Sequence, residues 1–183
     1  LLALSLLAST LGCVDSARQE LAAEVCSAVQ DGRHDEALVL SAEGASAVGA
    51  GRDVAECRCL AMLSTGDRDG CVALLDPLLR DEDATDWAPH PGLAKLMIGT
   101  WRAAGESAHA ARLARASSLR HPEDVHLAQA ELALRSQIED EEAVLADIES
   151  RLRDDPRSTA RRVVLSMAWA RRTDYAAAVR VLG

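Results

Sequence analysis

The sequence predicts an all-α protein, an α-solenoid of about five helix–turn–helix repeats, and two observations carry this expectation. Hydrophobic residues make up 49% of the 183 residues, yet the aromatic residues are only three Trp and one Tyr, with no Phe. β-Sandwiches and barrels need aromatic and β-branched residues at short regular spacing, whereas Ala and Leu suit closely packed helices. The second observation is a turn motif that recurs at a regular interval along the chain.

This motif usually opens with Gly, and a small side chain follows five positions later. Its copies begin at Gly32, Gly66, Gly105, Glu139 and Thr173, and the copy at Glu139 is the weakest. Three of the four steps between successive copies have the same length, and the step from Gly66 to Gly105 is longer. The longer step contains a Pro-rich stretch, 86–91, which is typical of an extended loop.

These copies resemble the tetratricopeptide repeat (TPR) family, whose helix–turn–helix unit has the same length as the three equal steps. Trp101 and Trp169 fall where the first helix of that family usually carries Tyr, and Pro122 and Pro156 close two of the units. The resemblance covers residues 18–183. It implies units near 18–51, 52–90, 91–124, 125–158 and 159–183, with the last one truncated.

Each unit should contain two helices separated by the recurring turn. We expect the first helices near 18–30, 52–64, 91–103, 125–137 and 159–171, and the second helices near 35–47, 69–80, 108–119, 142–153 and from 176 to the end. Gly at the turn supplies the left-handed backbone that ends a first helix. The small residue near the start of the second helix lets the two helices approach closely.

No charged residue precedes Asp15, and residues 1–13 have the length of a signal-peptide h-region, too short to span a bilayer alone. Gly12 and Cys13 match the end of a bacterial lipobox, although the two residues before them do not follow its usual order. We therefore expect export and lipidation at Cys13, on a protein that continues upstream. The alternatives are the tail of a transmembrane helix and the buried helix of a preceding repeat.

Four cysteines remain beside Cys13. Cys59 and Cys71 occupy the two small-residue positions where the helices of one TPR-like unit come closest, so a disulfide between them is compatible with the required geometry if the protein is exported. A second bridge, Cys26 to Cys57, is conceivable between the first helices of adjacent units. The alternative is four buried thiols in a reducing cytoplasm.

Nothing in the sequence forms a catalytic, metal-binding or cofactor-binding constellation. The five histidines form no HExxH motif, there is no Gly-rich phosphate loop, and no GxSxG elbow is present. A formal net charge of −9 argues against nucleic acid as a partner. Arg161, Arg162, Arg171 and Arg172 mark a basic patch, either a solvated helix face or a dock for an acidic segment. We therefore expect a protein that is not an enzyme and has no cofactor.

In TPR arrays the first helices line a concave groove that binds peptide segments, and the resemblance implies the same here. The family's groove pattern falls on Asp53, Glu56, Leu60, Leu63, Lys95, Arg102, His126, Gln129, Gln137, Met167 and Arg171. We expect a scaffold that binds a partner protein or peptide, lipid-anchored in the cell envelope and facing the periplasm. The alternative is a cytoplasmic interaction segment of a larger regulator, or of a membrane-bound enzyme, whose catalytic part lies outside this sequence.

Overall fold

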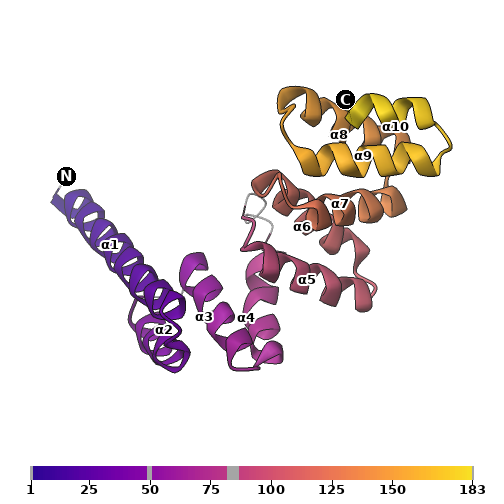
Figure 1. Cartoon of the computed structure of the whole chain (residues 1–183). Coiled ribbons are helices and arrows are strands. Elements are labelled where there is room, and N and C mark those ends of the chain that lie inside the picture. The colour runs from indigo at the N-terminus through magenta and orange to yellow at the C-terminus, as the bar shows by residue number, and fades with distance from the viewer. Residues whose placement is uncertain (1, 49–50, 82–86, 183) are drawn as a thin grey trace. The chain divides into compact units, whose positions relative to one another are not determined.

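The computed structural model describes the backbone of residues 2–48, 51–81 and 87–182, and the side chains of residues 16–44, 51–81 and 87–182. The described backbone forms ten helices and no strand (Figure 1). Their bounds are α1 Leu2–Gln30, α2 His34–Val48, α3 Arg52–Ser64, α4 Arg68–Arg80, α5 Pro91–Ala103, α6 Ser107–Arg120, α7 Val125–Ile138, α8 Glu141–Asp154, α9 Thr159–Arg171 and α10 Tyr175–Leu182. The all-α expectation is confirmed.

The helices repeat with the period that the sequence predicts. The second helix of each pair begins at His34, Arg68, Ser107, Glu141 and Tyr175. Each of these starts lies two positions after the start of a turn copy, so the helices reproduce the three equal steps and the single longer one. Helices α3, α5 and α9 have the bounds expected for first helices, and α7 ends one position later than expected. The fold is therefore an α-solenoid of five helix–turn–helix pairs within the described residues.

The first helix is longer than expected, because α1 begins at Leu2 and not near residue 18. Residues 2–30 contain no Pro and one Gly, and they are rich in Leu and Ala, which favour the helix. Nothing in this stretch therefore stops the helix before the repeat begins. Among the described residues, no helix has both the length and the apolar character that crossing a membrane requires.

The turns between the two helices of a pair adopt two different backbone conformations. Gly32, Gly66 and Gly105 have φ angles of 76°, 89° and 79°, the left-handed conformation expected for them. Thr173 takes the same role in the last turn with φ 61°. The turn between α7 and α8 differs, because its Glu139 has φ −124° and Asp140 caps α8 by accepting a hydrogen bond from the Ala143 amide. This is the copy that matched the turn motif least well.

The small residue after each turn is buried, as the repeat pattern requires. The five positions are Ala37, Cys71, Ala110, Val144 and Ala178, and their exposed fractions do not exceed 7%. A short side chain at this point brings the paired helices close together, and larger apolar side chains then pack on either side of the contact.

The chain divides into two compact units, residues 1–78 and 79–183. In the first unit, α1, α2 and α3 contact one another around a small core formed by Val25, Ala28, Ala37 and Ala61. Most of these side chains are no larger than Ala. Each of these small side chains buries little apolar surface, and partly buried Leu21, Val29, Leu38 and Leu40 pack against them.

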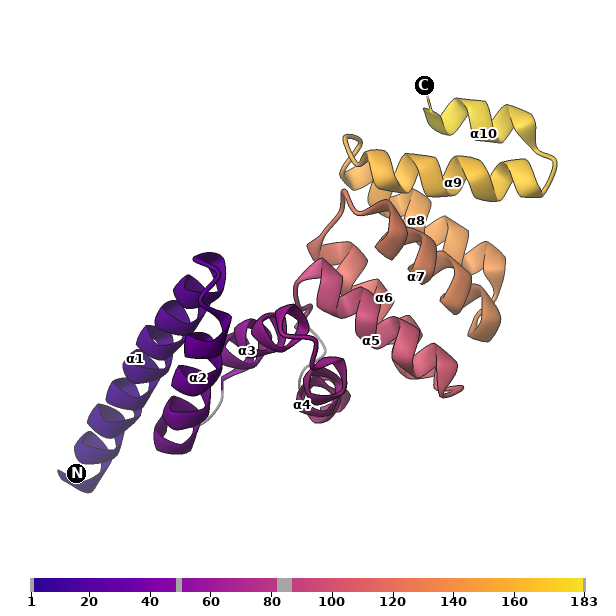
Figure 2. The same cartoon turned by 60° about the horizontal axis from the view of Figure 1, so that its bottom comes forward.

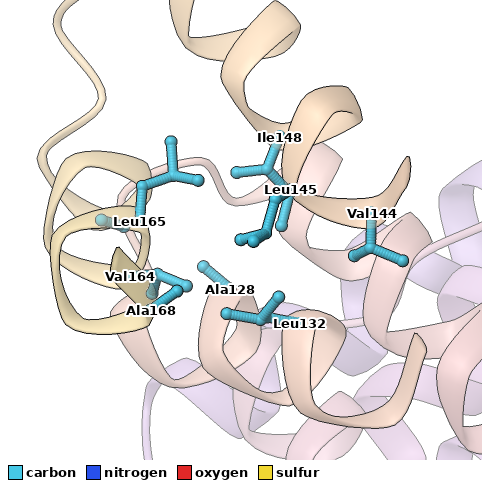
Figure 3. Close-up of a cluster of buried hydrophobic side chains, with 9 residues drawn as sticks. Ala128, Leu132, Val144, Leu145, Ile148, Val164, Leu165 and Ala168 are labelled. Atoms are coloured by element: carbon cyan, nitrogen blue, oxygen red, sulfur yellow. The ribbon is translucent and has the colours of Figure 1, made fainter. Parts of the chain in front are cut away.

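In the second unit α6 packs on α7, α7 on α8 and α9, and α9 on α10, which lies antiparallel beside it (Figure 2). Leu132 of α7, Leu145 and Ile148 of α8 and Val164 and Leu165 of α9 point toward one another in one cluster (Figure 3). Side chains from two successive pairs thus fill one core. Neither pair alone buries its apolar face. Each pair is therefore stabilised by stacking on the next, as in other repeat proteins.

Candidate functional site

The eleven residues predicted to line the groove all lie on first helices and all reach the surface. They occupy α3 (Asp53, Glu56, Leu60, Leu63), α5 (Lys95, Arg102), α7 (His126, Gln129, Gln137) and α9 (Met167, Arg171). Each is half-buried or exposed. Some of them line two hollows, one in each unit, and the two units are described in turn.

In the second unit, a hollow of about 270 Å³ lies between α7 and α9. Its lining residues are Gln129, Leu132, Ala133, Val164, Met167 and Arg171. Leu132 and Val164 are 3% and 2% exposed and form an apolar floor that continues into the core. Met167 is 47% exposed, and its sulfur lies 3.6 Å from Gln129 Nε2. The hollow therefore combines apolar contact with amide and guanidinium donors.

Three of the predicted groove residues, Gln129, Met167 and Arg171, meet at this hollow. Ala133 also lines it and was missed, although it lies one repeat period before Met167 and thus at the same position of its unit. That spacing is the signal that could have identified it.

Lys95 lies on α5, which contributes no residue to the lining of this hollow, and it forms an ion pair. Its Nζ lies 2.6 Å from the Asp124 carboxylate, which also caps α7 by accepting hydrogen bonds from the amides of His126 and Leu127. Burial raises the pKa of Asp124, but the hydrogen bond from Lys95 and the amide donors outweigh it, so the pKa falls below its usual value. Lys95 therefore helps to fix the start of α7.

Arg102, His126 and Gln137 are exposed on α5 and α7 and lie outside the residues that line the hollow. For these three positions the structure provides a surface location on a first helix and nothing more specific.

In the first unit a hollow of about 260 Å³ lies where α1 faces the start of α3. Arg18, Gln19 and Ala22 line it from α1, and Asp53 and Val54 from α3. Asp53 alone among the four groove residues predicted on α3 reaches it. Gln19 was missed although it precedes Asp53 by one repeat period, so the same signal could have identified it.

Glu56, Leu60 and Leu63 are half-buried on α3 and lie outside this lining. Since α3 packs on both α1 and α2, part of each side chain is covered inside the unit.

Four cysteines of the first unit form two disulfides. Cys59 of α3 joins Cys71 of α4 with Cα atoms 4.7 Å apart, and Cys26 of α1 joins Cys57 of α3 with Cα atoms 5.2 Å apart. Both separations lie within the usual range for a disulfide. One bridge ties the two helices of a pair, and the other ties neighbouring first helices. Cys13 lies outside the residues whose side chains the structure describes.

The sequence did not single out a buried ion-pair network in the second unit. Glu131 of α7 is 2% exposed and accepts hydrogen bonds from Arg135, from Arg151 of α8 and from the Ser118 hydroxyl of α6. Asp147 of α8 contacts both guanidinium groups. The two carboxylates and two guanidinium groups of this network balance in charge. Because the hydrogen bonds join side chains of α6, α7 and α8, the network fixes these helices to one another.

No three His, Cys, Asp or Glu side chains converge as metal ligands among the residues with described side chains. The residues that line the two hollows offer apolar contacts, hydrogen-bonding groups and charge.

The comparisons with known proteins are consistent with this architecture. No family model matches the chain, and no curated protein matches it. A solved structure of a MamA mutant is similar over 92% of this chain and 95% of its own length, with a TM-score of 0.52 and 15% sequence identity. At that identity the likeness concerns the fold alone, and MamA is a TPR-like helical repeat protein. The chain therefore has the fold of a TPR-like α-solenoid.

Proposed function

We propose that this chain is a protein–protein interaction scaffold that binds a segment of a partner protein along its first helices. The observation that carries the proposal is the hollow between α7 and α9, where Met167 stands exposed over the nearly buried Leu132 and Val164. Met adapts its shape to different apolar partners. Gln129 and Arg171 beside it can bond the carbonyl and carboxylate groups of a bound segment.

A TPR-like fold supports this function because stacked helix pairs present an extended surface suited to chain segments. The partner segment should place one apolar side chain in the hollow and its backbone carbonyls near Gln129. Arg171 should then favour a carboxylate further along the same segment. No catalytic step is part of the proposal.

Selection of displayed random peptides on the purified chain tests the binding site. Met167→Glu should weaken the binding of selected peptides about tenfold or more, because a carboxylate would stand over the apolar floor. The matched control is Leu119→Glu on the second helix α6, because Leu119 is 48% exposed and Met167 is 47% exposed. Equal losses in both variants, or no loss in either, would refute this site.

The cell envelope is the proposed location, with a lipid anchor on Cys13. The two disulfides support it, because such bonds persist in oxidising compartments and are rare in the cytosol. The uncharged run before Asp15 supports it as well.

Mass determination of the protein expressed from its full gene in a Gram-negative host tests the location. Thiols should be alkylated before and after reduction. A diacyl or triacyl adduct at Cys13, with the other four thiols reactive only after reduction, is the expected result. Intact residues 1–12 with five free thiols would instead favour an interaction segment of a larger intracellular protein.

A further inference from the structure

The C-terminal part of the chain carries charge of the opposite sign to the rest. Residues 151–183 contain eight Arg and three Asp, a formal charge of +5, whereas the whole chain carries −9. Residues 1–150 therefore carry −14. All eight basic residues are Arg and none is Lys, and the planar guanidinium group suits paired hydrogen bonds to carboxylates. Acidic residues keep the rest of the chain soluble, so solubility alone does not explain why Arg is concentrated in this segment.

A hollow of about 720 Å³ lies in this basic segment, bordered by α8, α9 and α10. Leu152, Trp169 and Val181 form its apolar wall, and each packs against the core of the second unit. Trp169 is fixed there because its indole nitrogen donates to Glu149 over 3.1 Å. Met167 lies two positions from Trp169, about 200° away around the helix, so this hollow opens on the other side of α9 from the hollow of the proposed function.

Cationic groups dominate the rim of this hollow. Arg153 and Arg180 are exposed, and neither has an ion-pair partner among the residues with described side chains. The two carboxylates in the lining are already engaged. Glu149 accepts from Trp169, and Asp174 caps α10 by accepting from the Ala177 amide over 2.9 Å.

We infer that this groove docks an acidic segment of a partner protein that carries a single apolar side chain. Carboxylates of the segment pair with Arg153 and Arg180, and its apolar side chain rests against Trp169. Charge complementarity selects this occupant, because two unpaired guanidinium groups stand beside an apolar wall. The site is additional to the α7–α9 hollow and does not depend on it.

A peptide is favoured over a membrane because the apolar wall is recessed. A protruding side chain can enter a hollow of this volume, which lies in the range of ligand sites, whereas a bilayer needs apolar groups that project. The nearby α10 does project Tyr175, Val179 and Leu182, which are 66%, 70% and 53% exposed. Anionic vesicles therefore belong in the test.

Fluorescence anisotropy with short labelled peptides at about 0.15 M salt, where distant charges are screened, provides the measurement on the whole oxidised chain. One peptide consists of Asp and Glu with one central Leu, a second replaces that Leu by Ser, and a third replaces the acids by Asn and Gln. Only the first should bind well. The double variant Arg153→Glu with Arg180→Glu should weaken its binding about tenfold or more. The control pair Arg68→Glu with Arg120→Glu makes the same change in net charge at residues that do not line the groove and should leave the dissociation constant within about twofold.

Several results would overturn the inference. Equal weakening by the control pair would show a general charge effect, and unchanged binding in the groove variant would place the peptide elsewhere. Failure of the first peptide to bind the native chain would also reject the site. Binding to phosphatidylglycerol vesicles without peptide binding would assign the basic end to a membrane. A concentration-dependent dimer that the groove variant abolishes would assign it to a second copy of the chain.

Discussion

Glu131 shows how one residue can join three helices. Its carboxylate is almost fully buried among Arg135, Arg151 and Ser118. A buried carboxylate without partners costs several kcal/mol. Hydrogen bonds from these three side chains offset that cost for Glu131. On α7 a Glu at this position would ordinarily be assigned to the solvent face. The repeat period nevertheless places this position inside, because Met97 and Leu165, one period before and after it, are both fully buried.

Asp147 completes the same network and makes it sensitive to acid. Burial raises the pKa of Asp147, but the hydrogen bond from Arg135 and the charges of Arg151 and Arg115 outweigh it, so the pKa lies below its ordinary value of 3.8. The folded state therefore binds this proton less readily than the unfolded state. The stabilisation is complete above about pH 5 and is lost as the pH falls through 3.8 toward the lower folded value.

Asp147→Asn should accordingly destabilise the second unit by about 1–2 kcal/mol at neutral pH, because Asp147 is only partly exposed and its partners would keep their charge. Urea unfolding at pH 7 and pH 3 measures the difference from the native chain, which should shrink at the lower pH. Glu123→Gln removes an exposed carboxylate outside the network and serves as the control. A difference that stays constant with pH would contradict the assignment.

At the scale of elements, the turns differ in how well their residues suit the left-handed backbone conformation. Three turns place Gly in the left-handed conformation, and the last places Thr173 there. A β-branched residue at positive φ is unfavourable by about 1–2 kcal/mol. Thr173 gains little in return, since its hydroxyl only donates to the carbonyl of its neighbour Arg172 at the surface.

Thr173→Gly should therefore stabilise the second unit by about 0.5–1 kcal/mol, after allowing for the greater freedom of Gly in the unfolded chain. The reciprocal change, Gly105→Thr, should destabilise it by a similar or larger amount. Gly105 is the right comparison because a Cβ there meets no neighbouring atom, so only the backbone is tested. Thermal melts of both variants decide the matter, and a Thr173→Gly chain that melts earlier would contradict the strain argument.

Most of the elements could be predicted from the sequence, and the candidate site could be predicted in part. The repeat period located the helices because turn residues and apolar spacing report directly on local structure. It identified first-helix positions equally well, and four of the eleven predicted groove residues, Asp53, Gln129, Met167 and Arg171, line the two hollows described above. The period determines which face a residue occupies. It does not determine what the side chain contacts there, such as the Asp124 carboxylate that pairs with Lys95.

At the scale of the whole molecule, the two units are stabilised in different ways. The first has a cluster of mostly Ala side chains, with Val54 and Leu75 also buried, and holds both disulfides. The second packs larger residues, among them Leu145, Ile148, Leu165 and Trp101, and its described residues contain no cysteine. Small cores commonly rely on covalent links, because they bury too little apolar surface to offset the lost chain entropy.

Reduction should therefore loosen one unit and spare the other. Closing loops with sequence separations of 31 and 12 residues stabilises a fold by about 2–4 kcal/mol per bridge. Amide hydrogen exchange followed by mass spectrometry should show that a thiol reductant speeds exchange in residues 16–78 and leaves exchange in residues 87–182 unchanged.

The paired variants Cys26→Ala with Cys57→Ala, and Cys59→Ala with Cys71→Ala, separate the two bridges. The Cys26–Cys57 pair should have the larger effect, since it closes the longer loop and joins neighbouring repeats. Equal acceleration throughout the chain would mean that the repeats unfold as one cooperative body, and no acceleration would mean that the apolar core alone holds the first unit.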